Sequence, residues 1–347
     1  MGEDCKWANG PGSTGFQPVG TSLPQASPQG AYPLVAAILA AGLGTRLRPL
    51  TYRCPKALVP VLNRPLLGFW LARLKAAGFT RVAVNTHHLT EEVAQFLARG
   101  DPWGMEILVR HEPELLGTGG GLKKLGELLG EAPFLAVNVD ILTDLDLAQV
   151  FRAHRDGALA TLVLHECPRY TGIWTDRKGA IHSIGALPRN PTGPPLAYTG
   201  VQVVTTELLR RIPDGPYDLV KAWQEALAAG GRLASLKADS LFWQDLGTPE
   251  DYLAAHRRLQ KGEAPSLTAF FPGGADPLMG PGAEIGPGVE FRGAVCLGAG
   301  VQVGAGASLK NTVVWDRARL APGVQLQDCI VAAGVEVTGS AQGKVLV

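Results

Sequence analysis

The stretch from Leu39 to Pro65, LAAGLGTRLRPLTYRCPKALVPVLNRP, joins an apolar strand to a glycine turn and then to spaced cations. The run Val35 to Ala41 is almost wholly apolar, as strands buried on both faces of a parallel sheet are. Gly42 and Gly44 let the next turn bring backbone N–H groups close to a ligand. This order predicts an α/β fold with a nucleoside triphosphate site at the end of its first strand.

Charge along this part of the chain is one-sided. No acidic residue occurs between Asp4 and Glu91, so the local field favours an anion. Over the whole chain, 32 basic and 31 acidic residues give a net charge of +1, which gives no reason to expect a nucleic-acid partner. The cations of the acid-free span include Arg46, Arg48, Arg53, Lys56, Arg64, Arg73, Lys75 and Arg81.

A dinucleotide-binding turn is the main alternative, because GLGTRL begins like GxGxxG. Leu47 occupies the third glycine position, and the acidic residue expected about 20 positions later is missing. No GxxxxGK followed by Ser or Thr occurs, which excludes a Walker-type loop. An ordinary glycine turn beside a solvated cationic face remains the structural alternative.

The motifs resemble a known family. The glycine turn and the cationic stretch resemble the signature of the sugar-1-phosphate nucleotidyltransferases, also called NDP-sugar pyrophosphorylases, which include the mannose-1-phosphate guanylyltransferases. The residues that carry this resemblance are LAAGLGTRLRPLT and the following PKALVPVLNRPLL. LGTGGGL (116–122), NVD (138–140) and WQDLGTP (243–249) follow in the family's order, so the resemblance covers residues 34 to 258. It implies a Rossmann-like three-layer domain with a mixed sheet.

The resemblance also implies a reaction. A sugar-phosphate oxygen attacks the α-phosphorus of a nucleoside triphosphate in line and expels pyrophosphate, so the protein must neutralise charge on two anions. Arg46 is expected to contact the triphosphate and stabilise departing pyrophosphate, because its guanidinium fork matches phosphate oxygens. Lys56 is expected to bind phosphate. The triphosphate turn would consist of Ala41, Gly42, Gly44 and Thr45.

Two aspartates are the expected metal ligands. Mg²⁺ prefers carboxylate, phosphate and water oxygens, with one or two carboxylates from the protein. Asp140 and Asp245 match family aspartates that hold the ion, although Val139 replaces the usual glycine of NGD. The nearby Asp144 and Asp146 are interpreted as a turn residue and a helix N-cap, because LTDLDLAQV is typical of a helix start.

The remaining candidate residues concern the base and the sugar. Gly117, Thr118 and Gly119 resemble the family's base-binding loop, in a form closer to guanylyl and muramyl-type uridylyl transferases than to thymidylyltransferases. Asn138, Thr199 and Gly200 are expected to bind substrate. The family's EKP lysine, which grips the sugar phosphate, is absent, and Leu187, Pro188 and Arg189 occupy its neighbourhood.

The expected substrates are GTP and mannose 1-phosphate, with Mg²⁺ as cofactor. Uridylyl or thymidylyl transfer to another sugar 1-phosphate is the alternative within the enzymes. A regulatory subunit that binds a nucleotide sugar is the alternative from another class, since the EKP lysine is missing. An acyltransferase in the C-terminal segment is disfavoured, because no histidine follows His256.

Strand and helix signals alternate after residue 33 in βαβ order. We expect strands at 35–41, 82–85, 134–137 and near 107, with helices at 66–74, 91–98 and 121–129. A meander at 160–164, 172–174, 181–184 and 199–204 would build the acceptor pocket, followed by helices at 217–229 and 249–259. Asp140 then follows the carboxyl end of a strand, where open α/β sheets bind ligands.

Apolar residues near the C-terminus recur every sixth position, at Ile285, Phe291, Leu297, Val303, Leu309 and Trp315. A second set comprises Val289, Val295, Val301, Ala307 and Val313, and after a one-residue slip Leu320, Val324, Leu326 and Ile330 continue. This resembles the hexapeptide repeat of left-handed parallel β-helices, whose repeated apolar side chains point inward. We expect this β-helix to be structural, and to support homo-oligomers.

Four segments follow from these patterns. Residues 1–32 are rich in Gly, Pro, Ser and Gln and are expected to be a disordered extension. The nucleotidyltransferase domain is assigned to 33–260, a Pro- and Gly-rich linker to 261–283, and the β-helix to 284–347. The sequence shows neither a membrane span nor a signal peptide, and its five scattered cysteines suggest no disulfide framework, so a cytoplasmic protein is expected.

Overall fold

The structure is a computed structural model that describes residues 33–98, 103–191, 193–271 and 276–347. The extension expected at 1–32 lies outside the described residues. From residue 33 onward, the described chain belongs to one compact unit.

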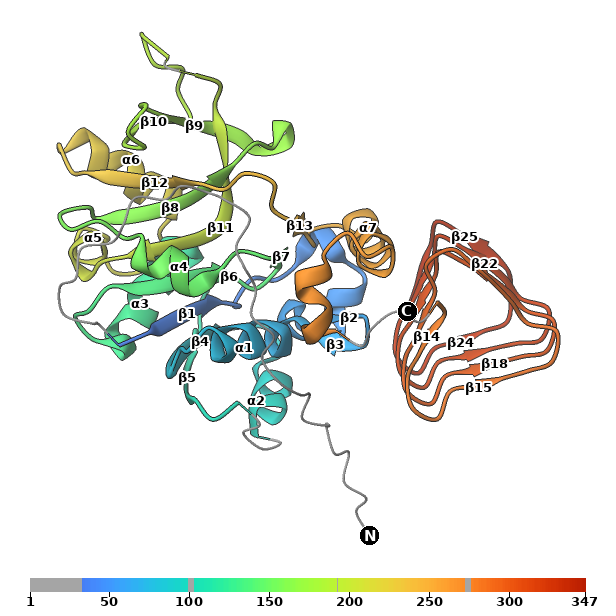
Figure 1. Cartoon of the computed structure of the whole chain (residues 1–347). Coiled ribbons are helices and arrows are strands. Elements are labelled where there is room, and N and C mark those ends of the chain that lie inside the picture. Colours follow the sequence, from blue (N-terminus) through green and yellow to red (C-terminus); the bar gives the residue numbers. More distant parts are fainter. Residues whose placement is uncertain (1–32, 99–102, 192, 272–275) are drawn as a thin grey trace. The chain divides into compact units, whose positions relative to one another are not determined.

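A mixed sheet of nine strands organises the N-terminal part (Figure 1). β1 (Val35–Leu39), β4 (Arg81–Thr86), β5 (Glu106–His111) and β6 (Phe134–Asn138) run parallel, with β1 between β4 and β6. β11 (Leu196–Val204) pairs with β6 in the antiparallel sense and is the last strand of the expected meander. The other strands of the meander are β8 (Ala160–His165), β9 (Thr171–Thr175) and β10 (Ile181–Ile184), and β12 (Leu233–Lys237) pairs in parallel with β8.

Helices cover both faces of this sheet, as the two buried clusters show. Ala36 and Ile38 of β1 belong to the cluster that contains α1 (Leu66–Ala76) and α7 (Pro249–Gln260). Val35 and Ala37 belong to the cluster that contains α3 (Gly117–Leu129), α5 (Thr206–Arg210) and α6 (Leu219–Ala228). The alternation along β1 explains its unbroken apolar sequence and confirms the three-layer fold. The other α-helices in the described part of the chain are α2 (Thr90–Ala98) and α4 (Leu147–Arg152).

Short elements at the carboxyl ends of these strands build the site. A two-stranded sheet joins β7 (Ile141–Thr143) to β13 (Trp243–Asp245). The cationic stretch forms the 3-10 helices η1 (Thr45–Leu47), η2 (Leu50–Tyr52) and η3 (Lys56–Leu58), then a hairpin of β2 (Pro60–Val61) and β3 (Arg64–Pro65). A further 3-10 helix, η4 (Pro168–Tyr170), lies between β8 and β9. Asp146 caps α4 by accepting the backbone N–H of Gln149 at 2.9 Å, as predicted.

The C-terminal part is the predicted left-handed parallel β-helix, built from three parallel sheets. One sheet contains β14 (Leu278–Met279), β17 (Cys296–Leu297), β20 (Val313–Val314), β23 (Ile330–Val331) and β26 (Val345–Leu346). The second contains β15 (Glu284–Ile285), β18 (Gln302–Val303), β21 (Arg319–Leu320) and β24 (Glu336–Val337). The third contains β16 (Glu290–Arg292), β19 (Ser308–Lys310), β22 (Gln325–Gln327) and β25 (Ala341–Gln342).

The segment interpreted as a linker, 261–283, contains regular structure. A 3-10 helix, η5, spans Pro265–Phe270, and β14 pairs with β17 as a rung of the β-helix. The repeat therefore starts before Ile285, the first residue of the predicted period. Met279 lies six residues before Ile285 and pairs with Leu297 but is exposed, whereas its neighbour Leu278 is buried in the cluster of α1 and α7.

The expected inward direction of Val313, Trp315 and Ile330 is wrong. Leu278 pairs with Cys296 eighteen residues later, but Cys296 pairs with Val313 only seventeen residues later. The coil loses its residue at the corner of Asn311, which has a left-handed φ of 48°. Val314 and Val331 therefore fill the interior, whereas Val313, Trp315 and Ile330 join the cluster of α1 and α7.

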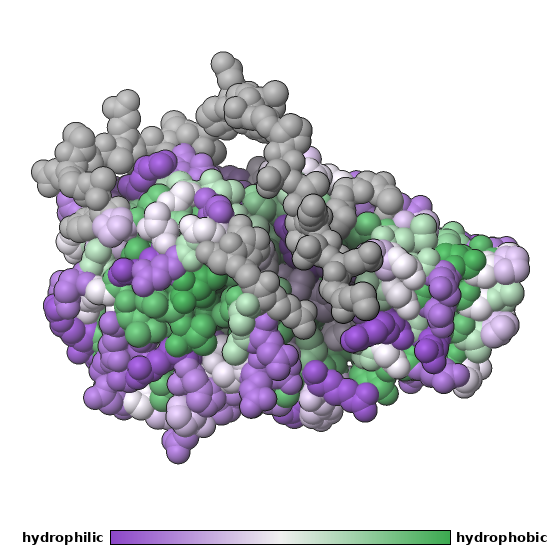
Figure 2. All heavy atoms as spheres, turned by 90° about the horizontal axis from the view of Figure 1, so that it is seen from below, coloured by the Kyte–Doolittle hydropathy of each residue, from purple (hydrophilic) through white to green (hydrophobic). Residues whose placement is uncertain are grey.

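No helix within the described ranges is long and apolar enough to cross a membrane. Exposed large hydrophobic side chains include Val109 on the edge strand β5 and Met279 on β14. Figure 2 shows hydrophilic and hydrophobic residues side by side on the face seen from below, including the β-helix at the right of the view.

Candidate active site

The glycine turn after β1 is held in a fixed shape. Gly44 has a left-handed φ of 61°, and a Cβ there would lie 2.8 Å from Cγ2 of Thr51. The Thr51 hydroxyl donates to the carbonyl oxygen of Gly44 at 2.9 Å, and Leu47 and Leu50 are buried on either side. These contacts leave the Arg46 side chain 56% exposed, so its guanidinium is accessible to an anion.

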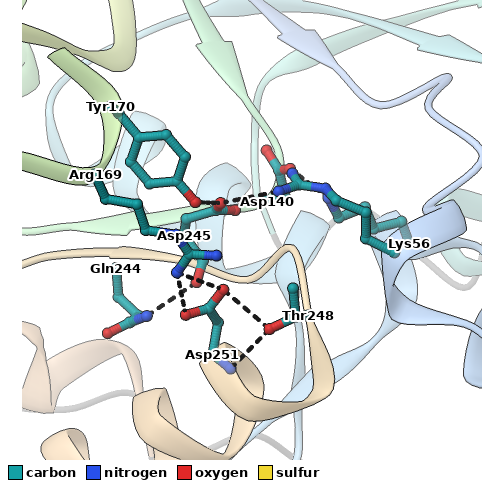
Figure 3. Close-up of polar contacts among 9 residues, drawn as sticks. Lys56, Asp140, Arg169, Tyr170, Gln244, Asp245, Thr248 and Asp251 are labelled. Atoms are coloured by element: carbon teal, nitrogen blue, oxygen red, sulfur yellow. Dashed lines mark hydrogen bonds and ion pairs between the residues drawn. The ribbon is translucent and has the colours of Figure 1, made fainter.

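Lys56 and Asp140 are brought together from positions far apart in the sequence. Asp140 follows β6 by two residues, and the N–H of Val139 donates to the carbonyl oxygen of Leu39 at 3.1 Å. The Lys56 Nζ contacts the Asp140 Oδ2 directly, and only 10% of the lysine side chain is exposed. The expected phosphate-binding lysine thus lies against an expected metal ligand (Figure 3).

The second aspartate lies beside the first through the β7–β13 pair, in which Asp245 is the partner of Ile141. An Arg46 nitrogen lies 3.8 Å from the Asp245 Oδ2. The arginine also covers Gly247, where a Cβ would come within 2.7 Å of the guanidinium. A residue larger than glycine at position 247 would displace the Arg46 side chain, which explains why the DLG sequence has a glycine there.

Tyr170 of η4 is a contact that the sequence analysis missed. Its hydroxyl donates to the Asp245 Oδ2 at 2.7 Å, as Figure 3 shows. Burial and this hydrogen bond to Asp245 raise the pKa of Tyr170. Arg169 beside it holds both oxygens of Asp251, at 2.8 and 3.0 Å. No local motif marked PRY as part of the site, since only the tertiary fold brings the meander over β13.

The donor set suits a hard divalent cation. Two carboxylates are the number that Mg²⁺ commonly takes from a protein, with phosphate and water oxygens completing its shell. Within the described residues, no group of three or more His, Cys, Asp and Glu side chains could hold a metal by themselves. Asp140 and Asp245 therefore fit an ion that arrives together with phosphate better than a closed metal site.

The expected base loop lies at the start of α3, four residues earlier than the predicted helix start. The N–H of Gly119 donates to the carbonyl oxygen of Tyr217 at 2.9 Å, and the Thr118 hydroxyl accepts the N–H of Leu219 at 3.2 Å. A Cβ at Gly117 would lie 2.7 Å from the same Tyr217 oxygen. These residues are thus bound to the segment that leads into α6, and Gly119 offers no spare N–H.

A buried pair, Asn85 and Glu112, connects this loop to the glycine turn. The Asn85 Oδ1 accepts the N–H of Ala40 at 2.7 Å, and its Nδ2 donates to the Glu112 Oε1 at 2.7 Å. The Glu112 Oε2 accepts the N–H of Leu116 at 3.1 Å. A Cβ at Gly121 would meet both side chains at 2.8 Å, so this glycine is required by the pair.

Of the expected sugar-side residues, Asn138 and Gly200 lie together and Thr199 does not face them. A Cβ at Gly200 would lie 3.4 Å from the Asn138 Cβ, at a bulge where β11 shifts register against β8. The Thr199 side chain is buried, and its hydroxyl donates to the carbonyl oxygen of Val163 at 2.9 Å. The Thr199 hydroxyl therefore stabilises the bulge, because its proton is already bound to the backbone.

Comparisons with known proteins agree with this fold. The family described as "Nucleotidyl transferase" matches residues 35–262. UTP–glucose-1-phosphate uridylyltransferase of Synechocystis sp. is 30% identical, covering 88% of this chain and 89% of the relative. Mannose-1-phosphate guanylyltransferase of Mycobacterium tuberculosis is also 30% identical, covering 84% and 82%. N-acetylmuramate alpha-1-phosphate uridylyltransferase of Caulobacter vibrioides is 33% identical, covering 65% and 97%.

A solved structure shows the same fold. The crystal structure of HddC from Yersinia pseudotuberculosis aligns over 64% of this chain and 97% of its own, with a TM-score of 0.55 and 22% identity. Because the family match covers well over half of the chain, the protein belongs to the nucleotidyl transferase family.

Proposed function

We propose that this protein transfers a nucleotidyl group from a nucleoside triphosphate to a sugar 1-phosphate and releases pyrophosphate. The observation that carries the proposal is the convergence of Arg46, Lys56, Asp140 and Asp245 at one edge of the sheet. Each aspartate has its own cation, and the arginine remains exposed. Such a site can accept two anionic substrates without leaving their charges unpaired.

The chain's residues divide this work by position. Arg46 extends from the glycine turn and would bind the pyrophosphate portion of the triphosphate with its planar fork. Lys56 is nearly buried against Asp140 and would transfer its contact to a phosphate oxygen when the nucleotide enters. Asp140 and Asp245 would hold Mg²⁺, which when bound supplies positive charge beside the phosphates. Tyr170 would keep the Asp245 carboxylate oriented.

For the substrates, our first choice is GTP with mannose 1-phosphate. The LGT sequence of the base loop and the similarity to the Mycobacterium tuberculosis guanylyltransferase support this choice. The second candidate is uridylyl transfer, which the names of the Synechocystis and Caulobacter relatives support.

A pyrophosphate-release assay with four triphosphates against a panel of sugar 1-phosphates tests the proposal. We expect turnover with one pair far above the others, and none after chelation of the metal. Turnover with UTP alone would replace the guanylyl assignment by the uridylyl one. A folded protein that binds nucleotide sugar and turns over no pair would instead be a binding subunit.

A further inference from the structure

The β-helix shares a hydrophobic core with the catalytic part. Cys296, Val313, Trp315 and Ile330 line the outer side of one β-helix sheet and belong to the same buried cluster as α1 and α7. That sheet therefore has apolar side chains on both faces, since Leu297, Val314 and Val331 fill its inner side. A free-standing solenoid would leave the outer set in water, at a cost proportional to its apolar area.

Tyr252 of α7 is the centre of this contact. Its side chain is fully buried, and its hydroxyl donates to the carbonyl oxygen of Pro60 in β2. The same hydroxyl accepts the indole N–H of Trp315 at 3.0 Å. One oxygen atom thus joins three segments: α7, the β2–β3 hairpin and the β-helix.

The hairpin turn makes a second set of contacts. Leu62 and Asn63 have left-handed φ values of 44° and 63°. The Asn63 side-chain amide donates to the carbonyl oxygen of Leu297 at 2.8 Å, and its oxygen accepts from the Cys296 thiol at 3.3 Å. The strained turn is therefore held against the β-helix by specific hydrogen bonds.

His256 connects the hairpin to α7. The N–H of Leu62 donates to its Nε2 at 3.2 Å, so the Nδ1 carries the proton that is shared with the carbonyl oxygen of Tyr252 at 3.0 Å. Burial lowers the pKa of His256 to about 4, so the ring is neutral at neutral pH. Only the neutral ring can accept from one side and donate to the other.

Both connected segments carry residues of the proposed site. Lys56 precedes Pro60 by four positions, and Asp245 precedes Tyr252 by seven, with the cap of α7 at Thr248 between them. Only a few residues of chain thus separate Pro60 from Lys56 and Tyr252 from Asp245. A displacement at Tyr252 would shift Lys56 and Asp245 relative to one another.

We propose that Trp315, Tyr252 and Asn63 are positioning residues that hold Lys56 and Asp245 in catalytic register, so that the β-helix takes part in catalysis without contributing a catalytic residue. This inference rests on the proposed nucleotidyl transfer for its kinetic part. It differs from the expectation that the β-helix serves structure or assembly alone.

The test uses Trp315→Phe in the full chain, which keeps an aromatic ring and removes the N–H donor. We expect kcat at saturating substrates to fall about 10- to 100-fold, because small misplacements of catalytic groups have effects of this size. KM for either substrate should change less than about twofold. Amide hydrogen exchange should accelerate in residues 56–66 and 245–252.

Trp223→Phe is the matched control. Trp223 is also buried, but it lies in the other core, and its indole nitrogen has no hydrogen-bond partner among the described residues. We expect normal kcat and unchanged exchange at 56–66. Asn63→Gly is an independent variant of the contact between the β-helix and the catalytic part. Glycine tolerates the left-handed φ but removes both side-chain hydrogen bonds of Asn63, so this variant should behave like Trp315→Phe.

Three results separate the possibilities. Normal kcat and unchanged exchange in folded Trp315→Phe and Asn63→Gly overturn the proposal. Lower melting temperatures with normal kcat overturn it too, since the contact between the β-helix and the catalytic part would then stabilise the fold without positioning Lys56 and Asp245. If the wild type turns over no substrate pair, the proposed function fails, and hydrogen exchange alone decides: no acceleration at 56–66 and 245–252 refutes the positioning role.

Discussion

The backbone N–H of Leu246 donates to the carbonyl oxygen of Asp140 at 3.0 Å, across two strands separated by more than a hundred residues in the sequence. This bond continues the β7–β13 pair by one residue, and it places Asp140 beside Asp245 before any ion or ligand arrives. The carboxylates are thus preorganised by backbone pairing. Their cations, Lys56 and Arg46, limit the repulsion between them.

Asp245→Asn and Asp140→Asn should each reduce turnover by more than about 100-fold, because losing a metal-ligand charge should exceed the 10- to 100-fold effect of losing an outer-shell partner. Asparagine preserves the shape of the side chain, so the fold should survive. A magnesium titration of the rate, with a thermal melt as the control, measures this. Near-normal metal dependence in Asp245→Asn would show that Asp245 is not a ligand.

Arg46→Ala should lower kcat by about 10²–10³, which is typical for removal of one preorganised contact to transition-state charge. The arginine is more than half exposed and lies over Gly247 and near Asp245, so little stability should be lost. Arg177→Ala, at another exposed arginine, is the control. A change in KM alone would make Arg46 a binding residue.

Tyr170→Phe removes the hydroxyl that donates to Asp245. We expect the magnesium concentration for half-maximal rate to rise about 10-fold, since outer-shell partners of metal ligands have effects of this order. The rate at saturating magnesium should change much less. An unchanged magnesium dependence would mean that the carboxylate is oriented without the tyrosine.

Gly121→Ala should destabilise the fold by about 1–3 kcal/mol, because the new methyl group would collide with Asn85 and Glu112 at 2.8 Å. Because that pair connects the glycine turn to the base loop, KM for the triphosphate should rise as well. Gly339→Ala is the control, because the same substitution there adds a carbon with no atom within 4 Å and so causes no collision. Equal melting temperatures for the two variants would contradict the collision.

Stability should depend on pH through His256, whose pKa falls from 6.5 to about 4 on folding. Between these values the unfolded chain binds a proton that the folded chain does not, so the free energy of unfolding rises with pH. The contribution is complete above pH 6.5 and is lost as the pH falls to about 4, amounting to about 3 kcal/mol. His256→Gln should flatten this part of the profile relative to wild type in urea unfolding. Parallel profiles for both proteins would exclude His256 as the cause.

The charged residues of the candidate site and the α/β fold that carries them could be predicted from the sequence. Arg46, Lys56, Asp140 and Asp245 lie in motifs whose chemistry is visible locally, and β1 and β6 are long enough to be assigned by their apolar runs. Tyr170, Asn85 and Glu112 were missed because their partners lie on other strands. The hydrogen bond of the Thr199 hydroxyl to the carbonyl oxygen of Val163 was not visible for the same reason, since Val163 lies across the sheet.

The direction of Trp315 illustrates a different limit. The six-residue period placed it inside the β-helix, and the slip was located after it, whereas the structure removes the residue at Asn311, before it. Both placements preserve an apolar residue at each following interior position. The pairing of Leu297 with Val314 distinguishes the two positions of the missing residue. That pairing depends on contacts between successive coils, which a short stretch of sequence does not reveal.

The short coil at Asn311 shows that a corner can lose a residue while the strands on either side keep their pairing. Inserting one residue there would restore an eighteen-residue separation between Cys296 and Val313, with Val314 still directed inward and the indole of Trp315 still directed toward Tyr252. A one-residue change within the strand would instead move each following side chain to the opposite face and break the contact between the two halves of the chain. Comparisons of such solenoids should therefore align coils by their corners before comparing the side chains between them.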